Sequence, residues 1–155
     1  MFLKGICLLC SGNSDQLWCR DCEHDMLDKQ NRCPVCASSS PQDRICGKCL
    51  NHEPAFRKTT VGFSYDYPVE HLIKSFKYRN CPEYSIAFAD AIFTRLDLGE
   101  RPDTIVPVPL HRKRQAQRGY NQSLLISKQL ANKLNIQVNN TLCKRRLDTP
   151  PQSKM

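Results

Sequence analysis

Four Cys-x-x-Cys pairs within the first 49 residues constrain this chain more than any other feature of its sequence. The chain has 155 residues and ten cysteines, eight of which belong to these pairs. The paired residues are Cys7 and Cys10, Cys19 and Cys22, Cys33 and Cys36, and Cys46 and Cys49. Two cysteines separated by two residues can place both sulfur atoms on one side of a tight turn, which suits two corners of a tetrahedral zinc site. Four such pairs in succession predict two closed four-cysteine sites, each with one structural Zn²⁺.

The sequence leaves open which pairs share a metal ion. Sequential pairing, the first pair with the second and the third with the fourth, gives two zinc ribbons in a row, whereas a cross-braced arrangement joins the first pair with the third. We favour sequential pairing because closing a shorter loop costs less entropy. His24 and His52 lie close to a pair and are alternative ligands, but eight sulfur atoms already complete two sites. A thiol redox protein is a weaker alternative, since metal-bound thiolates are not free dithiols.

The cysteine-rich block is too small to bury much apolar surface, so we expect metal binding to supply most of its folding free energy. We assign it to residues 1–55 as a double zinc ribbon with a structural role, because a closed site leaves no position for a substrate. The chain shows neither a secretory signal nor an apolar run of about 18 residues. We therefore expect it in the cytoplasm, where thiols stay reduced.

Residues 56–155 have a different pattern, in which short strands alternate with helices. The sequence predicts strands over residues 61–67 and 103–110, a further strand that begins near residue 136, and helices over residues 68–79, 82–98 and 121–134. This is an α/β pattern, but a doubly wound sheet usually has more strands. The fold class expected is therefore α/β, with residues 56–155 forming the first part of a larger domain.

A basic segment, residues 111–120, lies between the second predicted strand and the last predicted helix. Ligands of open α/β sheets bind beyond the carboxyl ends of strands, where the next helix presents its N-terminal N–H groups. A basic loop in that place suits phosphate or pyrophosphate, because arginine can bind two oxygen atoms through paired donors. A solvated run of charges is the alternative. The candidate phosphate-binding residues are Arg112, Lys113, Arg114, Arg118, Asn121 and Gln122.

The formal net charge of +8 is unevenly divided between the two parts of the chain. Residues 1–55 hold six Lys or Arg against seven Asp or Glu, whereas residues 56–155 hold seventeen against eight. Eight thiolates with two Zn²⁺ would make the first part more negative still. The positive charge therefore belongs to the α/β part, where a phosphate-bearing ligand would bind.

Several stretches, in the same order along the chain, resemble the competence protein F (ComF) family. They are the four cysteine pairs, Phe76-Lys77-Tyr78, residues 105–111 (Ile-Val-Pro-Val-Pro-Leu-His) and residues 118–122 (Arg-Gly-Tyr-Asn-Gln). The resemblance implies a double zinc ribbon joined to a type I phosphoribosyltransferase-like domain, and a role in the uptake or utilisation of extracellular DNA. It also implies phosphoribosyl pyrophosphate (PRPP) as a cofactor of a full-length relative, with residues 107–122 on the pyrophosphate side.

One motif of the family, two acidic residues shortly followed by Thr-Thr-Gly, has no counterpart in the sequence. Thr59 and Thr60 follow Arg57 and Lys58, so they lack the acidic pair. We therefore expect residues 1–155 to be the front part of a family member, truncated at its C-terminus, with no catalytic residues of its own and no PRPP binding.

The alternative function is a zinc-ribbon protein that binds single-stranded nucleic acid without enzymatic activity. The basic excess and the aromatic residues Trp18, Tyr78 and Tyr120 motivate it, because charge combined with base stacking binds single strands. The expected partners are single-stranded DNA and proteins of the DNA-uptake machinery.

Overall fold

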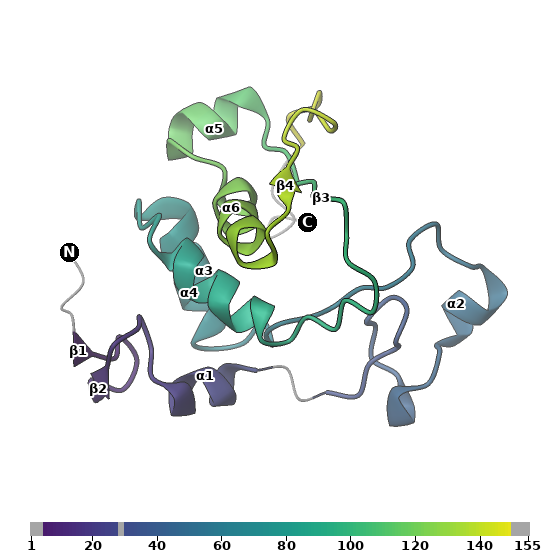
Figure 1. Ribbon diagram of the computed structural model, residues 1–155, viewed down its shortest axis with the longest axis horizontal. Coiled ribbons are helices and arrows are strands. Elements are labelled where there is room, and N and C mark those ends of the chain that lie inside the picture. The colour runs from purple at the N-terminus through teal and green to yellow at the C-terminus, as the bar shows by residue number, and fades with distance from the viewer. Residues whose placement is uncertain (1–4, 28–29, 150–155) are drawn as a thin grey trace.

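The computed structural model describes residues 5–27 and 30–149, which form short helices and strands (Figure 1). The N-terminal elements are β1 (Gly5–Ile6), β2 (Asn13–Ser14), α1 (Arg20–Met26), a 3-10 turn (Pro41–Asp43) and α2 (Gly47–Asn51). After them come α3 (Val69–Tyr78), α4 (Tyr84–Phe93), β3 (Thr104–Ile105), α5 (Arg112–Arg118), α6 (Gln122–Leu134) and β4 (Gln137–Val138). The described residues thus mix helices with two small sheets, as expected of an α/β chain. None of the described helices is long and apolar enough to cross a membrane.

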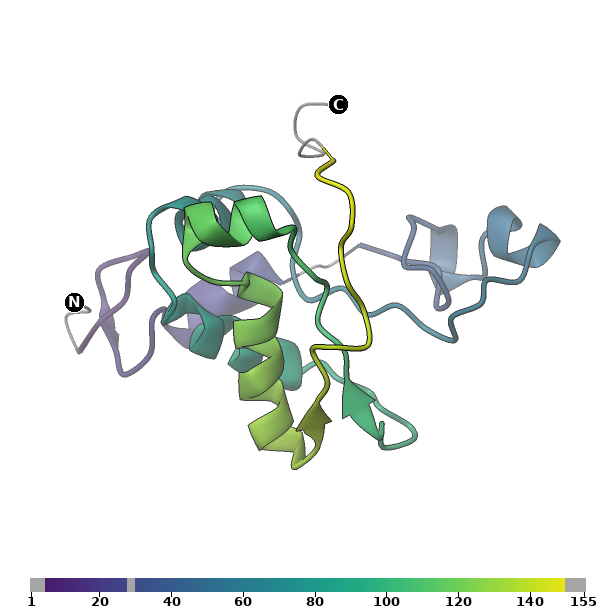
Figure 2. The ribbon, with the colours of Figure 1, turned by 90° about the horizontal axis from the view of Figure 1, so that it is seen from above.

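Three of the helices build the interior, because each has an apolar face. In α3, Val69, Leu72 and Phe76 recur at helical spacing and are all buried. Helix α4 is apolar on most of its surface, which is typical of a helix enclosed on several sides, and it packs against α6 (Figure 2). Lys133 of α6 adds an ion pair with Asp90 of α4, with 2.7 Å between Nζ and Oδ1.

β3 and β4 pair in parallel, with Ile105 opposite Val138. Helices α5 and α6 lie in the connection between the two strands, an arrangement typical of α/β chains. The first of these strands is much shorter than the predicted range 103–110. Pro107 and Pro109 have no backbone N–H to donate, so the ladder of hydrogen bonds ends before them.

Two other predicted elements differ from the structure. Residues 61–67, in which apolar and polar residues alternate, form no strand. They make one isolated β-bridge, between Phe63 and Leu27. Alternation is not sufficient for a strand, because a second strand must supply the hydrogen bonds. The helix predicted over residues 82–98 ends at Phe93 and is followed by turns.

The basic segment of residues 111–120 was predicted as a loop, but most of it is helix α5. Its arginine, lysine, glutamine and alanine residues are all strong helix formers, even without an apolar stripe. Gly119 ends the helix with φ 78°, a left-handed conformation that glycine adopts without steric cost. The difference affects the site, because a helix distributes its side chains over distinct faces.

An aromatic core joins the N-terminal part of the chain to the helices. Trp18 is only 1% exposed, and the centroid of its ring lies 5.4 Å from that of Phe88 and 6.4 Å from that of Phe63. Phe76 lies 5.8 Å from Phe88 and also 5.8 Å from Tyr120, measured between ring centroids. Offset and edge contacts of this kind are the ones that aromatic rings prefer. By contrast, α2 lies at one end of the molecule, away from the other helices (Figure 1).

Candidate metal centres and anion-binding pockets

The eight paired cysteines form two clusters, and in each cluster neighbouring pairs share a site. The first cluster consists of Cys7, Cys10, Cys19 and Cys22, and the second of Cys33, Cys36, Cys46 and Cys49. Within each cluster the four sulfur atoms all lie within 4.8 Å of one another. The structure therefore has the sequential pairing that loop length favours, and the cross-braced arrangement is wrong. We call residues 5–27 the first cysteine unit and residues 30–52 the second cysteine unit.

The two units repeat the same local structure, a tight turn followed by the N-terminus of a short helix. Cys19 is the N-cap residue of α1, and Cys46 is the N-cap residue of α2. The backbone N–H of Cys19 donates to Sγ of Cys7 at 3.3 Å, and the N–H of Cys46 donates to Sγ of Cys33 at 3.3 Å. Hydrogen bonds of this kind favour the charged thiolate and orient a metal ligand.

The turn after each first pair also repeats. Ser11 and Ala37 directly follow the second cysteine of their pair, and both have a left-handed backbone, with φ of 60° and 59°. Gly12 comes next in the first unit, where a Cβ atom would lie 3.3 Å from Sγ of Cys10. The glycine therefore leaves room for the sulfur atom. His24 and His52 are exposed and belong to neither cluster.

The spacing of the sulfur atoms fits zinc. A tetrahedral site with Zn–S distances of about 2.3 Å places its sulfur atoms about 3.8 Å apart. The Sγ–Sγ distance is 3.8 Å between Cys10 and Cys19, and 3.6 Å between Cys36 and Cys46. Each of these distances joins a cysteine of one pair to a cysteine of the other pair in the same cluster. Both clusters can therefore bind a metal ion.

The pKa values of the thiols point to a cation as well. The backbone N–H groups of Cys36 and Cys46 lower the pKa of Cys33 to about 6. Burial, together with the neighbouring sulfur atoms, raises the pKa of Cys49 to about 12 and also raises the pKa of Cys22. One thiolate therefore forms readily in the second cluster, whereas four thiolates at this spacing would need a bound cation to balance their charge.

The six predicted anion-binding residues do not form one site, because α5 directs its four cations to different faces and Asn121 and Gln122 stand at the start of α6. Arg112 and Gln115 line a pocket beside β3 and β4, which we call the strand-edge pocket. Arg114, Gln117 and Arg118 line a second pocket between α5 and the end of α3, which we call the α3–α5 pocket. The structure thus divides the basic segment between two pockets.

The strand-edge pocket has a volume of about 270 Å³ and lies beyond the carboxyl ends of β3 and β4. Three cations, Arg112, Lys144 and Arg145, are among its lining residues, and no acidic side chain is. Lys144 and Arg145 were not among the predicted site residues, although the run of three cations over residues 144–146 is visible in the sequence. Their position shows that both segments leaving the parallel strands bring positive charge to the same edge.

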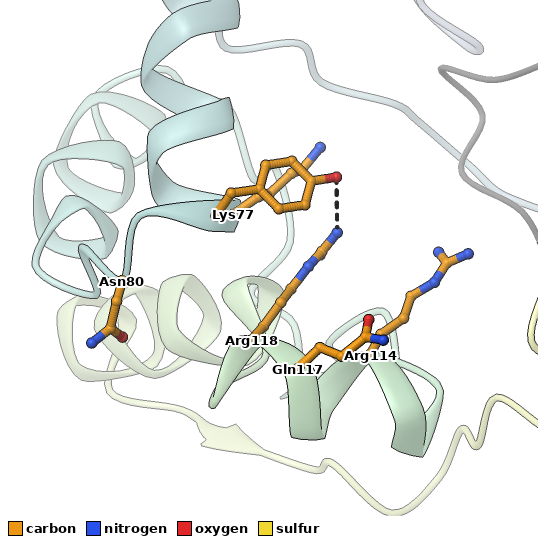
Figure 3. A pocket seen from close by; sticks show the side chains of 6 residues that line it. Lys77, Asn80, Arg114, Gln117 and Arg118 are labelled. Carbon is orange, nitrogen blue, oxygen red and sulfur yellow. Dashed lines mark hydrogen bonds between the residues drawn. The ribbon is translucent and has the colours of Figure 1, made fainter.

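The α3–α5 pocket has a volume of about 250 Å³ and likewise has no acidic lining residue. Its lining residues are Lys77, Tyr78 and Asn80 from the end of α3 and beyond, and Arg114, Gln117 and Arg118 from α5 (Figure 3). Arg118 lies over the ring of Tyr78, with 5.0 Å between Cζ and the ring centroid. Its Nη2 also donates to the hydroxyl oxygen of Tyr78 at 3.3 Å.

The other predicted residues have different surroundings. Lys113 is exposed and lines neither of these pockets. Asn121 also lines the strand-edge pocket. Its side chain accepts hydrogen bonds from backbone N–H groups in the first turn of α6 and donates one to the carbonyl oxygen of Val108. Gln122 is buried and accepts a hydrogen bond from Arg118. Asn121 and Gln122 therefore hold the backbone and Arg118 in place.

The three aromatic residues considered for base stacking also differ. Trp18 is enclosed in the core, and the hydroxyl of Tyr120 donates to the carbonyl of Phe76 while its ring packs on the Phe76 ring. The buried Trp18 ring is not available to a base, so that part of the prediction is wrong, and the half-buried Tyr120 ring is already packed on Phe76. Tyr78 is 64% exposed and keeps a free ring surface.

Two four-cysteine metal sites joined to a basic α/β part define the class of protein to which this chain belongs. The chain is 32% identical to competence protein F of Haemophilus influenzae over 154 residues, which cover 93% of this chain and 67% of that protein. The chain belongs to the competence protein F family.

Other relatives carry related names. The chain is 29% identical to the DNA utilization protein YhgH of Escherichia coli K12 over 126 residues, and 23% identical to the competence protein ComFC of Bacillus subtilis over 148 residues. The first match covers 77% of this chain and 56% of the relative, and the second covers 80% and 61%. The chain therefore spans about three fifths of the length of these relatives. No family model and no solved structure matches it.

Proposed function

We propose that this protein acts in the uptake or utilisation of DNA and that its strand-edge pocket binds a phosphate or pyrophosphate group. The names of the relatives, competence and DNA utilization, support the first part. The observation that carries the second part is the convergence of Arg112, Lys144 and Arg145 beyond the carboxyl ends of two parallel strands. Ligands of open α/β sheets bind at this edge.

The two cysteine clusters are proposed to hold structural Zn²⁺ within an N-terminal domain of residues 1–55. A closed site of four thiolates has no free coordination position, so zinc would stabilise the fold and would not act on a substrate. Residues 56–155 would then be the first part of a type I phosphoribosyltransferase-like domain. The parallel connection from β3 through α5 and α6 to β4 supports this assignment.

The strand-edge residues have complementary parts in binding a pyrophosphate. A guanidinium such as that of Arg112 can donate two parallel hydrogen bonds to two oxygen atoms, and Lys144 adds a compact point charge. Asn121 fixes the start of α6 at the wall of the pocket by capping it. Residues 1–155 contain no acidic pair shortly followed by Thr-Thr-Gly, the motif that by the family resemblance would bind the ribose hydroxyls of PRPP. We therefore propose that residues 1–155 alone do not catalyse phosphoribosyl transfer.

Calorimetric titration of the zinc-loaded chain with pyrophosphate at low salt tests this function. We expect Arg112→Ala and Arg145→Ala each to weaken binding about tenfold, because each removes a charge-assisted contact. Lys113→Ala is the matched control, since Lys113 is on the same helix but outside both pockets. Equal weakening by Lys113→Ala would show general attraction by charge and contradict a defined site. The strand-edge pocket changes the earlier expectation of no PRPP binding: PRPP should bind through its pyrophosphate group alone, no tighter than pyrophosphate, and much tighter binding would contradict the proposed lack of a ribose site.

The second candidate function is binding of single-stranded DNA without enzymatic activity. The exposed ring of Tyr78 beside the cations of the α3–α5 pocket favours it. Binding of a labelled oligonucleotide, followed by fluorescence anisotropy, should then fall steeply as salt increases. If no salt-sensitive binding is measured at low ionic strength, this candidate is excluded.

A further inference from the structure

We propose that the α3–α5 pocket is a second anion site, which binds the terminal 5′-phosphate of a nucleotide whose base stacks on Tyr78. This inference goes beyond the phosphate site proposed at the strand edge and rests on different residues. It depends on three observations: the charge of the pocket, the fixed position of Arg118, and the exposed ring beside it.

The charge of the pocket is positive and little of it is balanced. Lys77, Arg114 and Arg118 line it without an acidic neighbour in the lining. Nε of Arg114 lies 3.6 Å from Oδ1 of Asp148, so this one cation is partly balanced. Within residues 5–27 and 30–149, Lys77 and Arg118 have no ion-pair partner within 4.0 Å. A doubly charged phosphate would supply the missing counter-charge.

The side chain of Arg118 is already held in place. Its Nη1 donates to the amide oxygen of Gln122 and its Nη2 to the hydroxyl oxygen of Tyr78, both at 3.3 Å. These contacts use two of the five N–H donors of a guanidinium, and both acceptors are neutral. The remaining donors and the full charge are available to a phosphate. In Figure 3, Arg118 and Arg114 project from α5 toward the side on which Lys77 lies.

The ring of Tyr78 distinguishes a nucleotide from a simple anion. The Arg118 guanidinium covers one part of the ring, while 64% of the residue remains exposed. Tyr65 and Tyr67 are also exposed, but neither lines this cationic pocket. A volume of about 250 Å³ is just below the range of roughly 300–1,000 Å³ of sites that enclose whole ligands. Phosphate and sugar can occupy it, and the base would lie outside, against the ring.

Titration of the zinc-loaded chain with thymidine 5′-monophosphate, thymidine and inorganic phosphate tests the proposal. We expect the nucleotide to bind at least about fivefold tighter than phosphate, because stacking adds to the affinity. Arg118→Ala should weaken nucleotide binding about tenfold or more. Tyr78→Leu should reduce nucleotide affinity to that of phosphate, whereas Tyr78→Phe keeps the ring, loses only the hydroxyl contact with Arg118 and should weaken binding less. Tyr65→Leu is the matched control for an exposed tyrosine.

Separate variants keep the result independent of the strand-edge site and of folding defects. Arg112→Ala should weaken pyrophosphate binding at the strand edge and leave nucleotide binding unchanged. Arg118→Lys keeps the charge but loses the paired donors, so it should still weaken nucleotide binding severalfold. Zinc content and the fluorescence of Trp18 report whether each variant is folded. Nucleotide binding that is unchanged in both Arg118→Ala and Lys77→Ala would overturn the proposal, as would equal affinity for thymidine and its monophosphate.

Two oligothymidylate octamers, one with a 5′-phosphate and one with a 5′-hydroxyl, identify the source of the nucleotide. If the phosphorylated octamer binds tighter than the mononucleotide, the ligand is the end of a DNA strand. If the mononucleotide binds as tightly as that octamer, the ligand is a free nucleotide. Equal affinity for the two octamers would mean that the pocket binds internal phosphates, and the terminal-phosphate proposal would be wrong.

Discussion

The two cysteine units share their local structure but differ in what surrounds them. In the first unit, Trp18 directly precedes the third cysteine and is buried against Phe63 and Phe88. In the second unit, Ile45 occupies the same position and is 44% exposed. The first cysteine unit is therefore part of the hydrophobic core, whereas the second cysteine unit is organised mainly around its own four sulfur atoms.

The second cysteine unit is joined to the α/β part mainly by polar contacts. The backbone N–H of Thr59 donates to the carbonyl of Val35 at 2.8 Å. The segment after the unit also forms two exposed ion pairs, Arg57 with Glu100 and Lys58 with Asp97. Two clusters with the same local structure can therefore differ in their coupling: we expect a metal ion bound in the first unit to stabilise the whole fold, and one bound in the second unit to stabilise only its surroundings.

The largest difference is expected from losing one ligand in each unit. Structural zinc sites bind with about 10–16 kcal/mol, which is comparable to the stability of a whole domain. Cys22→Ser should therefore unfold the helices as well as the first cysteine unit. Cys49→Ser should release one zinc ion and leave the core intact. Native mass spectrometry gives the zinc count, and Trp18 fluorescence reports the core. Equal loss of the core in both variants would contradict the comparison.

Replacing the residue before the third cysteine tests the same difference without touching a ligand. Trp18→Ala should lower the free energy of unfolding by about 3–5 kcal/mol, because it leaves a cavity in the core. Ile45→Ala is the matched change in the second cysteine unit and should cost less than about 0.5 kcal/mol. Urea unfolding followed by far-UV circular dichroism measures both. A large effect of Ile45→Ala would mean that the second unit also contributes to the main core.

The smallest effect is expected from the exposed ion pairs. Lys58 donates to Asp97 and lowers the pKa of that carboxyl, so the pair stabilises the fold above the usual aspartate pKa of about 3.9 and is lost as the pH falls below it. Acid also protonates thiolates, so salt at neutral pH is the cleaner variable. Asp97→Asn should slightly raise hydrogen exchange in residues 30–52, and added salt should have a smaller effect on that variant, in which the Arg57–Glu100 pair is left to be screened. Unchanged exchange would show that the backbone contact alone holds the second cysteine unit.

The cysteine spacing was sufficient to predict both metal clusters and their sequential pairing. Each pair has its own turn, and short loops join neighbouring pairs, so local chemistry decides the geometry. The start of α6 near residue 121 was likewise predicted correctly, and Asn121 caps it, because an N-cap residue acts on the backbone two or three residues away. Features decided within a few residues were therefore accessible from the sequence.

Features that depend on distant parts of the chain were not. From the sequence, Trp18 was considered as a stacking residue. In the structure it is packed against Phe63 and Phe88, which follow it by 45 and 70 residues. The alternating residues 61–67 lacked a partner strand, which a single segment cannot reveal. Helix α5 was not predicted for another reason. Its residues are strong helix formers, but helices were predicted from apolar residues at helical spacing, which this segment lacks.

The turns at Cys7 and Cys33 recur 26 residues apart, but the helix starts at Cys19 and Cys46 recur 27 residues apart. The second cysteine unit thus has one additional residue between its pairs, where the 3-10 turn Pro41–Asp43 lies. The ligand geometry tolerates this change in length, since the Sγ–Sγ distance across the pairs is 3.8 Å in the first unit and 3.6 Å in the second, and we therefore expect the second unit to be exchangeable. An engineer could replace it with another metal-binding or peptide-binding insert, whereas the first unit would have to be redesigned together with the helices that enclose Trp18.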